Sequence, residues 1–315
     1  MDVGIKLNKN FVAAINRMEK KYGEKFLRLN GFGNENLNFS SFIDRFTQDN
    51  DKLVDLSVNP SANMAQKDIV TMINTMNEPH AKLLAFNKIF YEITKKYGRD
   101  AANEWLELVW NGSLYMHDAP SSSYMPYCWA MTLQPVAERG LFFIDQFPTR
   151  PAKHLTTFCD HVLETVSYMS NRQAGAVGLP DLLIYMYYFW REDVKNNHVL
   201  RDPTYYAKQC IQKVIYDMNQ PYLRITQSSF TNVSIMDREY LIGLFGGRDF
   251  PDGSPIMDDI EEIVEFEKLF MDVVHEIRAD HTFTFPVISY CLLYQNNRFV
   301  DEEFAHWASD CNSYW

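Results

Sequence analysis

The sequence predicts an α/β fold, in which amphipathic helices alternate with short strands. In several long segments, of which 80–97 and 258–279 are clear cases, apolar residues recur every three or four positions, as on one face of a helix. Between such segments lie short runs rich in β-branched and aromatic residues, at 127–133, 229–236 and 282–294. Strands separated by helices form either an α/β barrel or an open sheet, so the pattern alone leaves both architectures open.

Local signals indicate where the helices begin and end. Gly98 follows the apolar face of 80–97, Asp100 can cap the next helix, and Gly112 ends it. The segment 181–193 is almost entirely apolar, so its helix must be buried on most sides. In chain order we expect helices at 9–21, 66–76, 80–97, 101–110, 149–171, 181–193, 204–218, 258–279 and 301–315, strands at 113–118, 127–133, 229–236 and 282–294, and a turn at 173–181.

The chain changes in character near residue 56, which divides it into two parts. Residues 1–55 are polar and include a stretch rich in Gly and Asn at 29–41, so we expect an N-terminal polar extension. From residue 56 to residue 315 no linker or shift in composition interrupts the pattern. We therefore expect residues 56–315 to form one domain.

The composition excludes several classes of protein. With 46% hydrophobic and 15% aromatic residues, the 315-residue chain can bury a large core and is not disordered. Its net charge of −11 argues against a nucleic-acid coat and against a polybasic membrane anchor. The sequence has no run of about 18 apolar residues and no apolar leader, so we expect a cytoplasmic protein without membrane contact.

The five cysteines are widely spaced and never form a CxxC pair. This pattern favours reduced thiols over a disulfide framework, and it predicts no metal site in the chain. The common phosphate-loop, dinucleotide-binding and nucleophile-elbow motifs are absent as well. Composition and common motifs together therefore indicate only an α/β protein of unassigned function.

The segment 114–133 concentrates residues that suit chemistry. His117 and Asp118 lie at the end of one predicted strand, and Cys128 lies within the next strand, which would hold its thiol rigidly. A thiol in such a place can act as a nucleophile or transfer a hydrogen atom. The alternative is a buried thiol packed among aromatic side chains, and the residues alone leave both interpretations open.

The same segment resembles the first barrel strands of the anaerobic (class III) ribonucleoside-triphosphate reductases, which are glycyl radical enzymes. In that family a His-Asp pair precedes a cysteine on the first barrel hairpin. The resemblance covers about residues 55–315 and implies the first half of a ten-stranded glycyl-radical-type α/β barrel with surrounding helices. Four further segments resemble the family in the same order, namely VNPSANMAQKD (58–68), the stretch from Lys153 to Gln173, QSSFTNVSIMD (227–237) and FTFPVISY (283–290).

The resemblance implies roles for individual residues near the substrate. Cys128 falls at the position of the substrate-facing cysteine, whose thiol helps the ribose 2′-hydroxyl leave as water and donates a hydrogen. His117 and Asp118 match the pair that lines or braces the catalytic site, and a purely structural pair is the alternative. Asn232 and Ser229 belong to the strand expected to bind substrate, although the proline that the family has before the Phe is missing here.

A second site is implied on the helix that begins near Lys153. Lys153 and Glu164 match helix positions that contact an allosteric deoxynucleotide at the dimer interface, and a solvated helix face is the alternative. The resemblance therefore implies a homodimer with deoxynucleotide effectors, ribonucleoside triphosphates as substrates and formate as the reductant. It implies no direct binding of nucleic acid.

Some parts of the family's pattern have no counterpart in this sequence. The finger-loop cysteine, the glycine that stores the radical and the zinc site lie further downstream in the family. The glycyl radical, and the radical-SAM activating enzyme that generates it, are therefore expected to act on a C-terminal reductase part. An N-terminal ATP cone also has no room here, so inhibition by dATP through such a cone is not expected.

We therefore expect the N-terminal portion of an anaerobic ribonucleoside-triphosphate reductase, active only when the C-terminal part completes it. A half-barrel alone leaves a strand edge unpaired, and such an edge requires a partner. One alternative is a non-catalytic nucleotide-binding or assembly subunit derived from the reductase. Another is a different glycyl radical enzyme, such as a formate-lyase relative, but those relatives place their reactive cysteines downstream.

Overall fold

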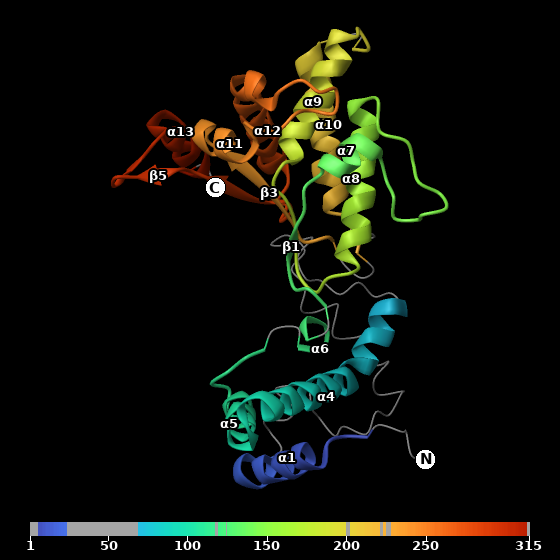
Figure 1. Cartoon of the computed structure of the whole chain (residues 1–315), viewed down its shortest axis with the longest axis vertical. Helices are drawn as coiled ribbons and strands as arrows, with labels where there is room; N and C mark the ends of the chain where they lie inside the picture. Colours follow the sequence, from blue (N-terminus) through green and yellow to red (C-terminus); the bar gives the residue numbers. More distant parts are fainter. Residues whose placement is uncertain are drawn as a thin grey trace. The chain divides into compact units, whose positions relative to one another are not determined.

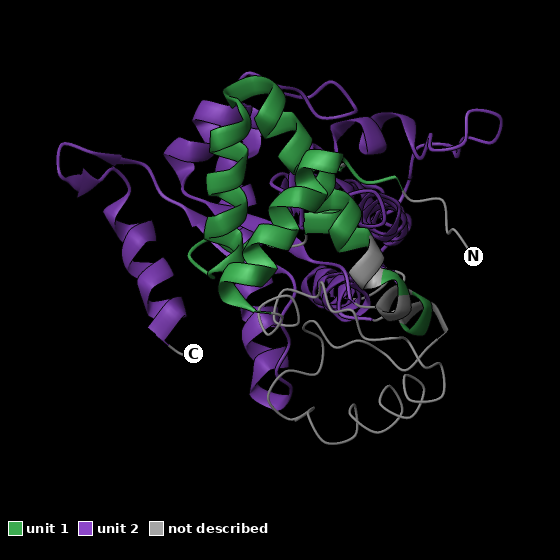
Figure 2. Cartoon of the chain, turned by 90° about the horizontal axis from the view of Figure 1, so that it is seen from below, with its two compact units in different colours: residues 1–54, 65–127 green, residues 55–64, 128–315 purple. Residues whose placement is uncertain are grey.

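The chain forms two compact units, which are coloured separately in Figure 2. The computed structural model describes residues 6–23, 69–116, 119–123, 125–199, 202–220, 223–224 and 228–313. Unit 1 comprises Met1–Val54 and Ala65–Tyr127, and unit 2 comprises Asp55–Met64 and Cys128–Trp315. The predicted domain boundary between residues 55 and 56 lies outside the described residues and stays a prediction.

Unit 1 is helical, with a small apolar core of its own. Phe11 and Phe90 pack with their ring centroids 5.5 Å apart, and Leu106 and Trp110 are buried beside them. The side chain of Asn8 caps the first helix by accepting a hydrogen bond from the Asn10 amide at 2.8 Å. The described helices of this unit are α1 (Lys9–Tyr22), α4 (Ile69–Tyr97), α5 (Arg99–Trp110) and α6 (Ala119–Ser122) (Figure 1).

Unit 2 is built on a four-stranded sheet in which all strands are parallel. The strands lie in the order β1 (Trp129–Ala130), β2 (Val177–Leu179), β3 (Thr231–Met236) and β4 (Val287–Cys291). Each pair of successive strands is joined through helices, because parallel neighbours need a crossover connection. The α/β prediction with helices between strands is therefore confirmed.

Helices occupy each connection of the sheet and follow its last strand. The three long helices α8 (Leu155–Ser170), α9 (Leu182–Lys195) and α10 (Pro203–Met218) lie next to one another in Figure 1. An antiparallel pair, β5 (Tyr294–Gln295) with β6 (Arg298–Phe299), extends beyond the sheet. The helices of this unit are α7 (Gln134–Arg139), α8 (Leu155–Ser170), α9 (Leu182–Lys195), α10 (Pro203–Met218), α11 (Arg238–Phe245), the short 3-10 helix Ile256–Asp259, α12 (Ile260–Asp280) and α13 (Glu302–Ser313).

The core of unit 2 lies between one face of the sheet and these helices. Val177, Leu179, Val233 and Ile235 alternate along β2 and β3 and are completely buried in the same apolar cluster as α8, α9, α10 and α12. Helix α9 contributes almost every residue of its first two and a half turns, which agrees with its apolar sequence. Successive strand residues point to opposite faces, so the intervening residues are free to serve a site.

The short elements differ from those expected. No strand forms over the described part of 113–118, since Ser113 and Leu114 lie in a bend, and only Trp129–Ala130 of 127–133 is strand. Helix α8 begins at Leu155 rather than at residue 149. Pro151 disfavours a helical conformation at the residue before it, and His154 is extended, with Asp193 of α9 accepting from the first helical amide, that of Leu155. The expected turn at 173–181 contains β2, residues 119–122 form the short helix α6, and the helices expected at 66–76 and 80–97 are one helix, α4.

Buried carboxyl groups join the connections at the carboxyl-terminal edge of the sheet. Asp181, which follows β2, accepts hydrogen bonds from the Thr132 hydroxyl and from the Leu133 amide at 3.0 Å. Asp237, which follows β3, accepts from the Tyr240 amide at 2.7 Å and from the Leu293 amide at 2.6 Å. Each aspartate therefore connects the end of its own strand to the end of a neighbouring strand.

A third buried carboxyl group lies behind the end of β3. Glu267 on α12 is 1% exposed, and its Oε2 accepts a hydrogen bond from the Met236 amide at 3.0 Å. Burial raises the pKa of Glu267 well above its usual value, and burial also raises the pKa of Asp181. The carboxyl group of Glu267 is therefore biased towards its neutral form.

Candidate functional site

The sheet of unit 2 has one accessible face with small and polar side chains. Ala130, Gly178, Asn232 and Val287 lie opposite one another on the four strands, so all four positions share this face. Ala130 and Val287 are exposed and Asn232 is half-buried, whereas the residues on the other face of β2 and β3 belong to the core. This face is the candidate active site.

Cys128 directly precedes β1, rather than lying within a strand as expected, and it is on the rim of this face. Of the five cysteines it is the exposed one, and its Sγ accepts a hydrogen bond from the Ala176 amide at 3.3 Å. Ala176 directly precedes β2, so the thiol is held between the first two strands. Strand alternation places Cys128 on the same face as Ala130, two residues further on. The alternative of a thiol buried among aromatic side chains does not describe this environment.

Asn232 is the second residue of β3 and lies on the same face. Its Nδ2 donates to the Val287 carbonyl at 3.1 Å and to the Ser289 hydroxyl at 2.8 Å, both on β4. These two bonds fix the amide plane and leave Oδ1 without a partner among the described residues. Asn232 is in register with Ala130 two strands away, and Cys128 lies two residues before Ala130, so Cys128 and Asn232 lie roughly 12 Å apart across the sheet. A ribose with its phosphates can span that distance.

The other predicted substrate residues lie elsewhere. Ser229 precedes β3 and is completely buried, and its hydroxyl donates to the Ser170 hydroxyl of α8 at 3.1 Å. It therefore faces the helices rather than the accessible side of the sheet. His117 and Asp118 lie outside the described residues. The roles of these three residues stay predictions.

Ser289 was missed by the sequence analysis, and its position explains why. It is half-buried on β4, two residues after Val287, and its hydroxyl holds the amide of Asn232. Its only signal in the sequence is the alternation of the strand after the Phe-Pro pair. Register between strands β3 and β4, which no single segment specifies, is what brings the two side chains together.

The predicted effector residues lie along α8 and just before it. Lys153 is exposed two residues before the helix, and Glu164 is exposed in its third turn. Thr156, Thr157 and Asp160 extend the same exposed polar stripe between them. The two residues are therefore accessible to a ligand, as the prediction requires, and the polar stripe is also what a solvated helix face would show.

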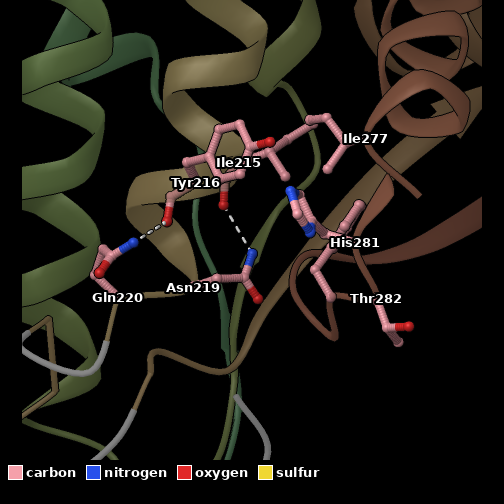
Figure 3. Close-up of a pocket in the computed structure, with 8 residues that line it drawn as sticks. Ile215, Tyr216, Asn219, Gln220, Ile277, His281 and Thr282 are labelled. Atoms are coloured by element: carbon pink, nitrogen blue, oxygen red, sulfur yellow. Dashed lines mark hydrogen bonds between the residues drawn. The ribbon is translucent and has the colours of Figure 1, made fainter. Parts of the chain in front are cut away.

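A separate pocket opens at the carboxyl-terminal ends of α10 and α12. It encloses about 140 Å³, and none of the predicted site residues lines it. Asn219 fixes one wall, because its side chain donates to the Ile215 carbonyl at 2.7 Å and accepts from the Phe285 amide at 3.1 Å. Figure 3 shows the lining side chains, which are Ile215, Tyr216, Asn219, Gln220, Ile277, His281, Thr282 and Phe283.

The described part of the chain holds neither a metal cluster nor a membrane-spanning helix. Within it, no group of three or more His, Cys, Asp or Glu side chains is arranged to hold a metal ion. Each helix in the same ranges is too short or too polar to cross a lipid bilayer.

Comparisons with known proteins identify the family to which the chain belongs. The family model described as anaerobic ribonucleoside-triphosphate reductase matches residues 74–314, and the chain belongs to this family. No curated protein matches the chain.

Solved structures of the anaerobic ribonucleotide reductase from Thermotoga maritima are similar along the whole chain. The complex with dATP and CTP is 34% identical, with a TM-score of 0.85, and the match covers 100% of this chain and 50% of that one. The form with dATP in the specificity site gives the same values. The form with citrate in the active site has a TM-score of 0.83 and is covered to 54%. The chain spans about half the length of these solved relatives.

Proposed function

We propose that this chain forms part of an anaerobic ribonucleoside-triphosphate reductase and carries its substrate-facing thiol, Cys128. The single observation that carries this proposal is the position of Cys128, exposed at the rim of a face of small and polar side chains. Family membership supplies the class of reaction, and the accessible sheet face supplies a place for it. The product of this reaction is a deoxynucleotide, which is used for DNA synthesis.

The residues of the accessible face have separate roles in the reaction and in orienting the substrate. Cys128 donates a hydrogen to the ribose and assists departure of the 2′-hydroxyl as water. Asn232, held by β4, orients the ribose or a phosphate through its free carbonyl oxygen. Formate supplies the two electrons and leaves as carbon dioxide. His117 and Asp118 brace the thiol's surroundings, and Ser229 contributes to the substrate strand through its contact with α8.

The rest of the reductase is provided by polypeptide equivalent to the remaining half of the longer relatives. In this proposal, the four strands described here form part of the ten-stranded barrel, and the remaining strands close over the accessible face. The glycyl radical resides in that other half, where a radical-SAM activating enzyme generates it. Two copies associate in the cytoplasm as a homodimer, with a deoxynucleotide effector bound by Lys153 and Glu164.

Replacement of the thiol tests the proposed chemistry. In the activated enzyme under anaerobic conditions, Cys128→Ser should abolish conversion of ribonucleoside triphosphate to the deoxynucleotide, because a hydroxyl is a far poorer hydrogen donor. Binding of dATP should be unchanged, since the effector residues are untouched. The matched control is Cys311→Ser on α13, which should retain most of the turnover. Turnover by Cys128→Ser would contradict the assignment.

A further inference from the structure

A buried carboxylate on α9 lies at the start of the predicted effector helix. Asp193 is 1% exposed and accepts three hydrogen bonds. Its Oδ2 accepts from the Leu155 amide at 2.9 Å and from the Tyr206 hydroxyl at 2.8 Å, and its Oδ1 lies 2.7 Å from Nδ1 of His154. One side chain therefore ties together α8, α9 and α10 immediately beside Lys153.

The contact with Asp193 orients the ring of His154. A carboxylate can only accept, so the shared proton belongs to Nδ1 and the second ring nitrogen, Nε2, is left for another partner. The side chain of His154 is 41% exposed while Asp193 is 1% exposed, so a ligand from solution reaches the imidazole but not the carboxylate. Asp193 thus holds the ring on its buried side, and the outer side of the ring faces solvent.

Groups that can carry positive charge gather at this place in an acidic chain of net charge −11. Lys153 is exposed beside His154, and the ring of His198 lies edge-on to that of His154, with centroids 4.6 Å apart. The titratable groups in contact from the packed elements are Asp193 of α9 and Tyr206 of α10. Such a cluster favours a phosphate, which accepts charge-assisted hydrogen bonds.

We propose that His154 is a phosphate-binding residue of the deoxynucleotide effector site, and that Asp193 is the positioning residue that orients its ring. This inference rests on the proposed function of Lys153 and Glu164 as effector contacts. Because Nδ1 already donates to Asp193, Nε2 donates to a phosphate only when the ring is protonated. This contact therefore requires uptake of a proton by the ring when the phosphate binds.

Two amide substitutions separate binding from structural support. In His154→Asn the amide nitrogen stands near Nδ1 and keeps the bond to Asp193, but no atom reaches the place of Nε2. In His154→Gln the longer side chain returns an uncharged donor to that place. With the full-length protein, titration calorimetry with dATP should show affinity about tenfold weaker for His154→Asn, a smaller loss for His154→Gln, and no change for the control His306→Gln on α13.

The dependence of dATP affinity on pH distinguishes phosphate binding by His154 from a purely structural role, which would not change this dependence. Wild type should gain more affinity for dATP between pH 8 and pH 6 than either variant, because the phosphates titrate in all three proteins and only wild type has the imidazole. If His154→Asn does not fold, His154→Gln alone decides the question through this profile.

Three results would overturn the inference. In the first result, His154→Asn binds dATP with the affinity and pH profile of wild type, while Lys153→Ala binds dATP weakly. The effector site would then be in place, and His154 would lie outside it. If the pH profile of dATP binding by His154→Gln equalled that of wild type, His154 would also lie outside the site. Failure of wild type to bind dATP at any of these pH values would remove both this inference and the proposed effector site.

Discussion

Buried carboxyl groups support the sheet at the scale of single residues. Asp181, Asp237 and Glu267 each accept a backbone amide near the carboxyl-terminal ends of the strands, where the chain leaves the sheet. Backbone amides buried away from water require such partners, since leaving one unpaired costs about 1–3 kcal/mol. These side chains therefore hold the connections around the candidate site rather than taking part in its chemistry.

Glu267 makes the stability of the protein depend on pH. Its pKa is raised in the folded state, so between the usual glutamate pKa and this raised value the folded protein holds a proton that the unfolded chain has released. Stability therefore falls as the pH rises through this range. Glu267→Gln keeps an acceptor for the Met236 amide and removes the titration. We expect the variant to gain stability relative to wild type as the pH goes from 5 to 8.

Urea unfolding of wild type and Glu267→Gln at both pH values measures this gain. The matched control is Glu265→Gln on the exposed side of α12, for which the difference from wild type should stay small at both pH values. A difference between Glu267→Gln and wild type that does not change with pH would contradict the assignment of a raised pKa.

At the scale of elements, the close approach of β1 and β2 positions Cys128. A Cβ added to Gly178 would lie 3.2 Å from both Cα and Cβ of Ala130, closer than ordinary packing allows. Glycine therefore lets a two-residue strand join the sheet, and Cys128 is held by the residue just before β2. Because β1 pairs with β2 over only two residues, the pairing is weak, and a steric clash at Gly178 would disrupt it.

Gly178→Ala should destabilise unit 2 by about 1–3 kcal/mol, because the added methyl group forces the two strands apart. The control is Gly243→Ala on α11, where an added Cβ meets no heavy atom within 4 Å and helix propensity favours alanine by up to about 1 kcal/mol. Urea denaturation of both variants provides the comparison. Equal stability of the two variants would show that β1 and β2 do not need their close contact.

The sequence predicted the long elements well because their apolar periodicity extends over many residues. Helices α9, α10 and α12 lie within a few residues of their expected bounds, and β3 falls inside its expected range. Strand β2 was missed because three residues within a glycine-containing turn give no periodic signal.

The candidate site was predictable only in part, and for a similar physical reason. Cys128 and Asn232 were identified through the family resemblance, and strand register then brought them onto one face. Ser289 and His154 have no motif, since their roles come from partners 57 and 39 residues away in the sequence. Such partners become visible only when the strands and helices are packed.

At the scale of the whole molecule, the accessible face of unit 2 needs a cover. Among the described strands, β1 and β4 each have one paired neighbour, and the solved relatives are about twice as long as this chain. Open strand edges pair with other strands or are shielded in stable proteins. The central claim is therefore that this sheet face functions inside a complete reductase, where further polypeptide closes the site around Cys128.

Native mass spectrometry of the protein, purified anaerobically from its own source, tests this claim most directly. The account predicts that the 36.9 kDa sequence is found together with polypeptide equivalent to the other half of the relatives, either in one longer chain or as a bound second chain. A lone 36.9 kDa chain, or a homodimer of it without that half, would contradict the account.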